Sequence, residues 1–236
     1  MPSFKLSARF PTPIADMILP QSERLNRPLA ERFLAWERDE PERSSIPTQV
    51  PKHAVYESDF SLFSRDDPTV RELARLCLER LGELIMHLNH YSVAEMRSLR
   101  IFHHSWYHVT RRGGYTSVHN HPMACWSGVY CVTPGETPSG TTDNGALCFL
   151  DPRPNPATYT DPGNAYLQEG FAAGNLAWQL VPGQLLLFPS WLLHEVRPFW
   201  GRDERITVAF NAWVRPAGAS VDEPGVLLRH PAAEQA

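Results

Sequence analysis

The chain has 236 residues, a length at which many all-β proteins form one domain. Its hydrophobic content of 42% and charged content of 20% are ordinary for a globular protein and exclude disorder of the whole chain. A net charge of -4 argues against a broad electrostatic surface for nucleic acid. The longest apolar runs, such as residues 184–188, are far shorter than the ~20 residues of a membrane helix. We therefore expect neither nucleic acid nor membrane as a partner.

Proline, cysteine and the first residues narrow the class further. The 22 prolines are roughly twice the usual share and indicate many short elements joined by turns. The first ten residues lack a basic start followed by an apolar stretch, so we expect no signal peptide and a cytoplasmic location. None of the four cysteines forms a C-x-x-C pair, which favours reduced thiols over a zinc site or a disulfide.

Two helices are expected in the first part of the chain. Apolar residues recur at helical spacing over residues 22–39, and Pro28 indicates that this helix begins there, with proline in its first turn. Residues 40–56 contain three prolines and are interpreted as a loop. Asp67 is a candidate N-cap for a second, strongly periodic helix over residues 68–90.

From about residue 98 the hydrophobic period changes from 3.6 to two, which is typical of strands. Short segments with this period alternate with glycine and proline turns, one of them at residues 112–114. The candidate strands are residues 99–109, 115–121, 127–132, 146–150, 176–180, 185–189, 193–196 and 205–214. We predict one α+β, mainly β domain over residues 1–236, with a helical part (about 1–95), a β-sandwich or barrel core (about 98–214) and a tail (216–236).

Three of the ten histidines are candidate metal ligands. His119 and His121 lie two apart on a predicted strand and therefore share a face. Two converging imidazoles suit iron, copper, nickel or zinc, although surface histidines would show the same spacing. His194 lies in an apolar segment, where its ring nitrogens need partners that either a metal or the backbone can supply.

A strand near the C-terminus carries a second candidate. The alternation over residues 205–214 places Arg205, Thr207 and Asn211 on one face and apolar residues on the other. An arginine that projects into a barrel is costly unless an anion meets it. A bidentately bound carboxylate ligand and an internal salt bridge, with Asp151 as a candidate partner, both remain open.

In this order, the motifs resemble those of the 2-oxoglutarate- and iron(II)-dependent oxygenases. The resemblance rests on His119-Asn-His121, a distant His194 and Arg205-x-Thr207. It extends over roughly residues 8–214 and includes seven short blocks, at residues 9–14, 119–122, 126–130, 149–153, 182–189, 191–196 and 205–211.

The resemblance implies a fold and a set of roles. The fold would be a double-stranded β-helix, a cupin-like jelly roll with helices packed on its major sheet. His119 and His194 would hold Fe(II), and Arg205, helped by Thr207, would bind the distal carboxylate of 2-oxoglutarate. Further candidates for contact with the oxo-acid are Ser127 and Tyr130, which point to opposite faces of their strand, and Asn211, which shares the face of Arg205.

One position departs from the family pattern. The superfamily usually has an aspartate or glutamate two residues after the first histidine, where this chain has His121. Three arrangements stay open. His121 is a neutral third ligand, or it turns away and leaves two histidines, as in the aspartyl/asparaginyl β-hydroxylases, or Asp151 reaches the metal. We favour His121 as a ligand.

The resemblance implies a dioxygenase that hydroxylates an unactivated C–H bond of a small molecule, amino acid or peptide. O2 would be the co-substrate, and succinate and CO2 the co-products. The alternative is a non-oxidative cupin-like metal-binding protein, either an isomerase or a small-acid-binding module; an inactive jelly roll is a third reading. The Arg205-x-Thr207 pair favours the oxygenase, because a generic cupin does not need it. The sequence indicates no substrate and no oligomeric state, and a homodimer is compatible with it.

Overall fold

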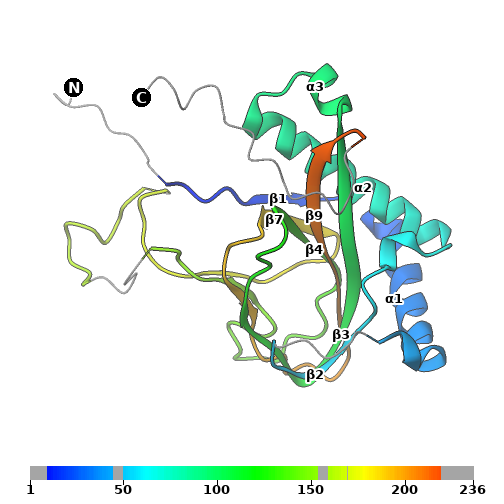
Figure 1. Ribbon diagram of the computed structural model, residues 1–236. Helices are drawn as coiled ribbons and strands as arrows, with labels where there is room; N and C mark the ends of the chain where they lie inside the picture. The colour runs from blue at the N-terminus through cyan, green and yellow to red at the C-terminus, as the bar shows by residue number, and fades with distance from the viewer. Residues whose placement is uncertain (1–9, 45–49, 154–158, 169, 219–236) are drawn as a thin grey trace.

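A computed structural model describes residues 10–44, 50–153, 159–168 and 170–218 (Figure 1). Three α-helices and nine strands make up this part of the chain. In chain order they are β1 (Ala15–Ile18), α1 (Ser22–Asp39), β2 (Lys52–Glu57), α2 (Pro68–Asn89), α3 (Val93–Arg97), β3 (Leu99–His119), β4 (Trp126–Thr133), β5 (Leu147–Phe149), β6 (Leu176–Trp178), β7 (Gln184–Pro189), β8 (His194–Val196) and β9 (Arg205–Pro216). The predicted tail lies almost wholly outside the described residues.

The strands form one antiparallel sheet that curls back on itself. Their order is β1-β7-β4-β9-β3-β8-β5-β6, and β2 pairs separately with β3. Figure 1 shows the long strands β3 and β9 side by side, with the helices mainly on one side of them and the shorter strands and their loops on the other. This is the double-stranded β-helix with helices on its major sheet, and the predicted fold class is confirmed.

The helices cover one face of the sheet, where the larger hydrophobic core lies (Figure 1). The stripe of α1 and the apolar face of α2 pack on residues of β3, β4, β7 and β9. The side chains buried between these layers include Leu29, Phe33, Leu73, Leu81, Tyr107, Tyr130, Leu185, Ile206, Val208 and Phe210. A smaller cluster, with Leu147, Phe149, Leu186 and Phe188, fills part of the space on the opposite side of the sheet.

Local chemistry sets where α2 begins, whereas tertiary packing sets where α1 begins. The Asp67 carboxylate accepts hydrogen bonds from the backbone N–H groups of Thr69 and Val70, so α2 begins as predicted. The predicted start of α1 at Pro28 is wrong, because that helix begins at Ser22 and contains Pro28. Burial of Leu25 before the proline offsets the missing backbone hydrogen bond.

Three strand predictions also need correction. The turn expected at residues 112–114 does not separate two strands, because β3 runs through Gly113 and Gly114 as one 21-residue strand. Part of the loop expected over residues 40–56 is strand β2, whose Lys52 and Glu57 lie opposite Thr116 and His108 of β3. Strand β1 pairs with β7 and was not expected. These pairings join segments distant in sequence, so local periodicity does not indicate them.

Two further findings concern cysteines and membranes. The cysteines are free thiols, as expected: Cys77, Cys131 and Cys148 are buried, and Cys125 lies at the surface. None of the helices in the described part of the chain has the length and apolar character that a membrane span requires.

Candidate metal centre

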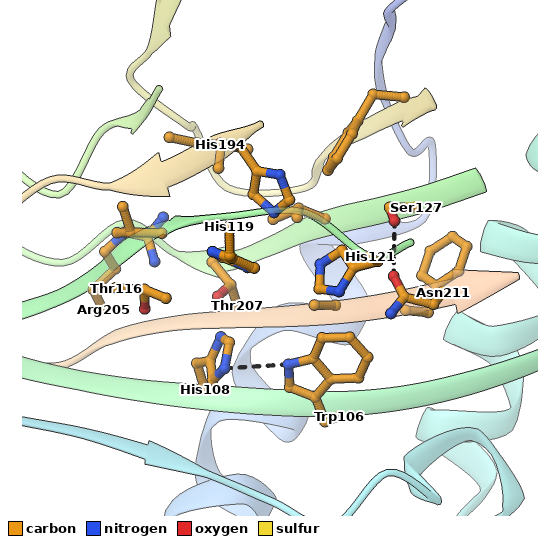
Figure 2. Close-up of a pocket in the computed structure, with 17 residues that line it drawn as sticks. Trp106, His108, Thr116, His119, His121, Ser127, His194, Arg205, Thr207 and Asn211 are labelled. Carbon is orange, nitrogen blue, oxygen red and sulfur yellow. Dashed lines mark hydrogen bonds between the residues drawn. The ribbon is translucent and has the colours of Figure 1, made fainter. Parts of the chain in front are cut away.

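Three histidines meet where β3 ends and β8 begins (Figure 2). His119, the last residue of β3, lies opposite His194, the first residue of β8, in the strand register. Their ring centroids are 4.3 Å apart, and the ring of His121 lies 5.0 Å from that of His119 and 5.2 Å from that of His194. One nitrogen from each ring lies within 4.8 Å of the others. The three imidazoles can therefore face one metal ion.

Two of the three rings are held by backbone carbonyls in the same way. The Nδ1 atom of His119 lies 2.8 Å from the carbonyl oxygen of Ser117. The Nδ1 atom of His194 lies 2.9 Å from the carbonyl oxygen of Leu192. An Nδ1–H that donates to a carbonyl leaves the lone pair of Nε2 for a metal, and such bonds are typical around metal-binding histidines.

His121 is held differently. Within the described residues its ring makes no hydrogen bond, and it packs edge-on against Trp106 at a centroid distance of 5.9 Å. Its backbone is fixed, because its N–H donates to the carbonyl of Ser190 at 2.8 Å. The ring of His121 therefore has more rotational freedom than those of His119 and His194.

The histidines are suited to bind metal as neutral ligands. Burial lowers the pKa of His119 below its ordinary value of 6.5. Burial, helped by the neighbouring His119, lowers the pKa of His121 to about 4. Burial lowers the pKa of His194 to about 3, again with help from His119. Near neutral pH the rings are thus unprotonated, the form in which imidazole coordinates metals.

Arg205, the first residue of β9, lines a cavity together with the three histidines (Figure 2). It is only 3% exposed, and Thr207, which is 2% exposed, follows it on the same face of the strand. No hydrogen-bond acceptor or carboxylate pairs with the guanidinium among the described residues. Burial lowers the pKa of Arg205, and the nearby Cys131 opposes this only in part. Gly145 makes room for this side chain, because a Cβ there would lie 2.9 Å from Arg205 Cδ.

Asp151 neither neutralises Arg205 nor joins the histidines. Its carboxylate pairs with Arg153, with an Nη2–Oδ2 distance of 2.5 Å, and it also accepts a hydrogen bond from the backbone N–H of Gly174. The internal salt bridge considered for Arg205 is therefore absent from this part of the chain. The acid also lies outside the group of possible metal ligands in the described residues.

Ser127 and Asn211 form a polar wall beside the histidines. The Ser127 hydroxyl lies 2.7 Å from Asn211 Oδ1 and 2.8 Å from Ser190 Oγ, and Figure 2 shows the bond to Asn211. Tyr130 lies on the other face of β4, where its hydroxyl donates to Asn26 of α1 at 2.5 Å. Tyr130 lies three positions after Ser127, and residues an odd number of positions apart on a strand point to opposite faces. The structure therefore argues against Tyr130 as a cofactor contact.

The histidines line two cavities that share part of their wall. The inner cavity, of about 40 Å³, is lined by all three histidines, Arg205 and Thr207. The outer cavity, of about 170 Å³, is lined by His119 and His121 but not by His194 or Arg205. Trp106, interpreted from the sequence only as packing or pocket wall, lines the inner cavity. Among the wall residues that the sequence interpretation did not assign are His108 and Thr116 in the inner cavity and Val50, Lys52, Glu57, Phe60 and His104 in the outer one.

Part of this cavity wall could have been predicted from the sequence. His104, Trp106 and His108 alternate along β3 and thus share a face, as the period of two implies. For Lys52 and Glu57 no local signal was available. They reach the cavity only because β2 pairs with β3 across a long sequence separation.

The comparisons with known proteins agree with this geometry. The sequence model of a family described as "Putative 2OG-Fe(II) oxygenase" matches residues 104–211, which include the three histidines and Arg205. Among curated proteins, none matches this sequence.

Solved structures of low sequence identity share the fold. A prolyl hydroxylase from Trichoplax adhaerens, in complex with a hypoxia inducible factor peptide fragment, has a TM-score of 0.57 and 13% identity over 85% of this chain and 83% of its own. A Pseudomonas putida prolyl-4-hydroxylase has a TM-score of 0.52 and 19% identity, with 87% and 93% covered. The epimerase SnoN from nogalamycin biosynthesis, in complex with Fe3+ and alpha ketoglutarate, has a TM-score of 0.53 and 15% identity, with 92% and 89% covered.

The structural matches establish the fold, and the family match covers the segment that carries the histidines and Arg205. That family uses Fe(II) and 2-oxoglutarate. Residues 104–211 of this protein are thus similar to the family described as "Putative 2OG-Fe(II) oxygenase".

Proposed function

We propose that this protein is a dioxygenase that hydroxylates an unactivated C–H bond of a small molecule, an amino acid or a peptide side chain. His119, His121 and His194 would hold Fe(II), and Arg205 with Thr207 would bind the distal carboxylate of 2-oxoglutarate. Ser127 and Asn211 would supply polar groups to the same wall. O2 would be the second substrate, and succinate and CO2 the co-products.

The observation that carries this proposal is the unpaired Arg205. A guanidinium that is 3% exposed and has no anion among the described residues is costly to bury. It shares a cavity with three histidines that can hold a metal. A dicarboxylate that binds the metal with its oxo-acid end and Arg205 with its other end satisfies both, since guanidinium and carboxylate match as a bidentate pair.

The charges of the site also fit this pair of cofactors. Three neutral imidazoles leave the ferrous ion with its full double charge, which the two carboxylates of 2-oxoglutarate offset. Imidazole suits iron among several divalent metals, and the match of residues 104–211 to the model of the 2OG-Fe(II) oxygenase family favours iron over the others.

When bound, Fe(II) and 2-oxoglutarate supply the oxidising chemistry, in which one oxygen atom of O2 enters succinate, the other enters the substrate and CO2 is released. The residues of the chain position and protect this reaction. Arg205 fixes one end of the co-substrate, and the carbonyls behind His119 and His194 fix the ligand rings. Leu147 and Phe188 line the inner cavity and exclude water from it.

The three ligands should contribute unequally. Because carbonyls orient the rings of His119 and His194 and no hydrogen bond orients that of His121, the first two should dominate iron affinity. We expect His119→Ala and His194→Ala to lose iron at micromolar metal. We expect His121→Ala to retain iron with lower affinity, as measured by anaerobic iron titration. Equal retention of stoichiometric iron in all three variants would contradict the metal assignment.

The central experiment is an anaerobic titration with Fe(II) and then 2-oxoglutarate, followed by the visible metal-to-ligand charge-transfer band. Arg205→Ala should keep iron and weaken 2-oxoglutarate binding by about 3–5 kcal/mol, a few hundred- to a few thousand-fold. Arg205→Lys should restore only part of the affinity, because an ammonium lacks the guanidinium fork.

Two outcomes would overturn parts of the proposal. A wild-type protein that binds iron but never 2-oxoglutarate would favour the non-oxidative, cupin-like alternative. Unchanged 2-oxoglutarate affinity in Arg205→Ala would mean that another group binds the distal carboxylate.

A further inference from the structure

Asn211 belongs to the part of the wall that the inner and outer cavities share. Arg205 lines only the inner of these two cavities and lies six residues earlier on β9, about 20 Å away along an extended strand. The carbon chain of 2-oxoglutarate is much shorter than this separation. A 2-oxoglutarate molecule held at Arg205 and the metal therefore leaves the Asn211 side chain to a ligand in the outer cavity.

Two buried hydroxyl groups determine which way the Asn211 amide faces. The Ser127 hydroxyl donates to Asn211 Oδ1 at 2.7 Å and lies 2.8 Å from Ser190 Oγ. Because the single hydroxyl hydrogen of Ser127 is used in the bond to the amide oxygen, Ser190 donates to Ser127. The opposite direction would leave the Ser190 hydrogen without an acceptor among the described residues. Ser190 is 0% exposed, so that loss would cost free energy.

This arrangement leaves the amide nitrogen of Asn211 free to donate. With the amide oxygen bonded to Ser127, no residue in the described part of the chain accepts a hydrogen bond from the two N–H groups. Figure 2 shows the Asn211 nitrogen on the side away from Ser127. A ligand that reaches it is expected to offer an acceptor, because a facing N–H or O–H donor would leave both groups unsatisfied.

An aromatic wall lies beside this donor in the outer cavity. His104 of β3 lies directly opposite Asn211 of β9 in the strand register, and Trp106 follows on the same face of β3. Phe60 meets Trp106 edge to face at a centroid distance of 5.2 Å. The cavity volume of about 170 Å³ is close to that of an engineered cavity of ~150 Å³ that accepts benzene. The part of a ligand that lies against these side chains is therefore about the size of one ring.

We propose that Asn211 selects the substrate by donating an amide N–H to a carbonyl oxygen, while a flat, ring-sized apolar part of the same substrate lies against Phe60 and Trp106. This inference rests on the proposed oxygenase function and narrows its substrate class. The two serine hydroxyls fix the donor, so a ligand with an acceptor at this position is favoured over one with a donor. The substrate is then held beside His121, whose ring packs on Trp106.

The test compares two flat, uncharged, ring-sized probes without turnover. N-methyl-2-pyridone offers a carbonyl acceptor and no N–H or O–H donor, whereas pyrrole offers an N–H donor and no strong acceptor. Each probe is titrated calorimetrically into protein that holds Fe(II) and saturating 2-oxoglutarate under anaerobic conditions. The measured quantity is the ratio of the two affinities in each variant relative to wild type, which removes the difference in apolar area between the probes.

Removal of the donor should affect the carbonyl probe alone. Asn211→Ala should weaken pyridone binding by about 3- to 10-fold, the usual effect of losing a neutral hydrogen bond, and should not weaken pyrrole binding. If Asn211→Ala does not fold, Asn211→Asp, which keeps the shape of the side chain but has no N–H donor, should lose at least as much pyridone affinity. Unchanged pyridone affinity in the folded variant would overturn the inference. Loss of pyrrole affinity instead would mean that the amide oxygen faces the cavity and would also overturn it.

Ser127→Ala tests the orientation of the amide rather than its presence. Without the Ser127 hydroxyl the Asn211 side chain can turn over and present its oxygen to the cavity. The pyrrole affinity should then rise and the pyridone-to-pyrrole ratio should fall by about 3- to 10-fold. An equal loss of both affinities would show a purely structural role and overturn the assigned orientation. Ser105→Ala is the matched control, because it removes an equally buried hydroxyl, which accepts from the backbone N–H of Phe63, and should leave the ratio unchanged.

The charge-transfer band separates this inference from the proposed function. Wild-type protein that never shows the band defeats the proposed function. A normal band, together with equal pyridone affinity in wild type and Asn211→Ala, removes the inference alone. A loss of 2-oxoglutarate affinity in Asn211→Ala that exceeds its loss of pyridone affinity would assign the amide to the oxo-acid and would also overturn the inference.

Discussion

The two faces of β9 have opposite properties although they belong to one strand. Toward the helices, Ile206, Val208 and Phe210 are at most 1% exposed and part of the larger core. Toward the cavity, Arg205 and Thr207 are almost as buried but polar. On the first face burial stabilises the fold, and on the second face burial leaves the Arg205 charge without a partner among the residues that the structure describes. Alternation along one strand thus separates stability from ligand binding.

The largest expected effect tests the helix-covered face. Phe210 is fully buried and its ring contacts Phe63 at a centroid distance of 5.6 Å. Phe210→Ala should lower the free energy of unfolding by about 3–5 kcal/mol, as for other large buried aromatic residues. Urea denaturation measures this change. A loss below about 1 kcal/mol would mean that this face contributes little to stability.

The cavity face should respond with the opposite sign. Arg205→Met removes an unpaired buried charge and keeps an apolar chain, so the free energy of unfolding of the metal-free protein should rise by about 1–3 kcal/mol. Arg111→Met, at an exposed ion pair with Glu37, should change it by less than about 1 kcal/mol. Urea denaturation of both variants decides the comparison. A marked destabilisation by Arg205→Met would reveal a structural partner for the guanidinium.

The pH dependence of the free energy of unfolding should come from residues that line the cavity. Burial lowers the pKa of His121 to about 4 from 6.5, so between these values the unfolded chain binds a proton that the folded, metal-free protein does not. The free energy of unfolding should therefore fall as the pH drops from about 6.5 toward 4, by at most about 1.4 kcal/mol per pH unit for each such histidine. His121→Asn should reduce this slope, as measured by urea midpoints across the range. An unchanged slope would remove His121 as its source.

Glu57 should act in a lower pH window. Its bonds to His108 and Lys52 outweigh burial and lower the pKa of its carboxyl from 4.5 to about 2. This contribution to stability is complete above about 4.5 and is lost as the pH falls toward 2. Glu57→Gln should flatten the acid limb below pH 4.5. The limb assigned to His121 should still begin near pH 6.5, because the unfolded chain sets that end, although loss of the Glu57 charge lowers the pKa of His121 further.

The smallest effect tests a residue on the helix-covered face of β4. Tyr130→Phe removes the hydrogen bond to Asn26 and should lower the free energy of unfolding by about 0.5–1.5 kcal/mol. The affinity for 2-oxoglutarate should not change, because Tyr130 does not line the inner cavity. Ser127→Ala, on the cavity face, is the matched comparison and should weaken that affinity. A loss of 2-oxoglutarate binding in Tyr130→Phe would restore Tyr130 as a cofactor contact.

Local pattern was sufficient for most of the β core. The alternation over residues 205–214 predicted which side chains of β9 face the helices, and the structure confirms that separation. Asp67 predicted the start of α2 because a cap depends only on its own first turn. Pro28 misled the prediction for α1, because contacts with the distant sheet decide where that helix begins.

The candidate site was predictable in part. His119, His121 and Arg205 follow from spacing and alternation, since the faces of a strand depend only on the local backbone. The sequence left open whether Ser127 or Tyr130 faces the cofactor. In the structure Tyr130 faces α1, where its hydroxyl donates to Asn26. Lys52 was missed, because three prolines made residues 40–56 look like a loop and the pairing with β3 is not encoded locally.

By itself, the sequence determined the class of the fold, the histidines that can meet at a metal and the inward direction of Arg205. The tertiary structure alone decided what surrounds them: the carbonyls behind His119 and His194, the lack of an acid beside Arg205 in the described residues, and the ion pair of the outer cavity. The physical reason is the separation in sequence over which each property is set. Periodicity is a property of a few neighbouring residues, whereas partners for a buried charge come from strands that pair over long separations in sequence.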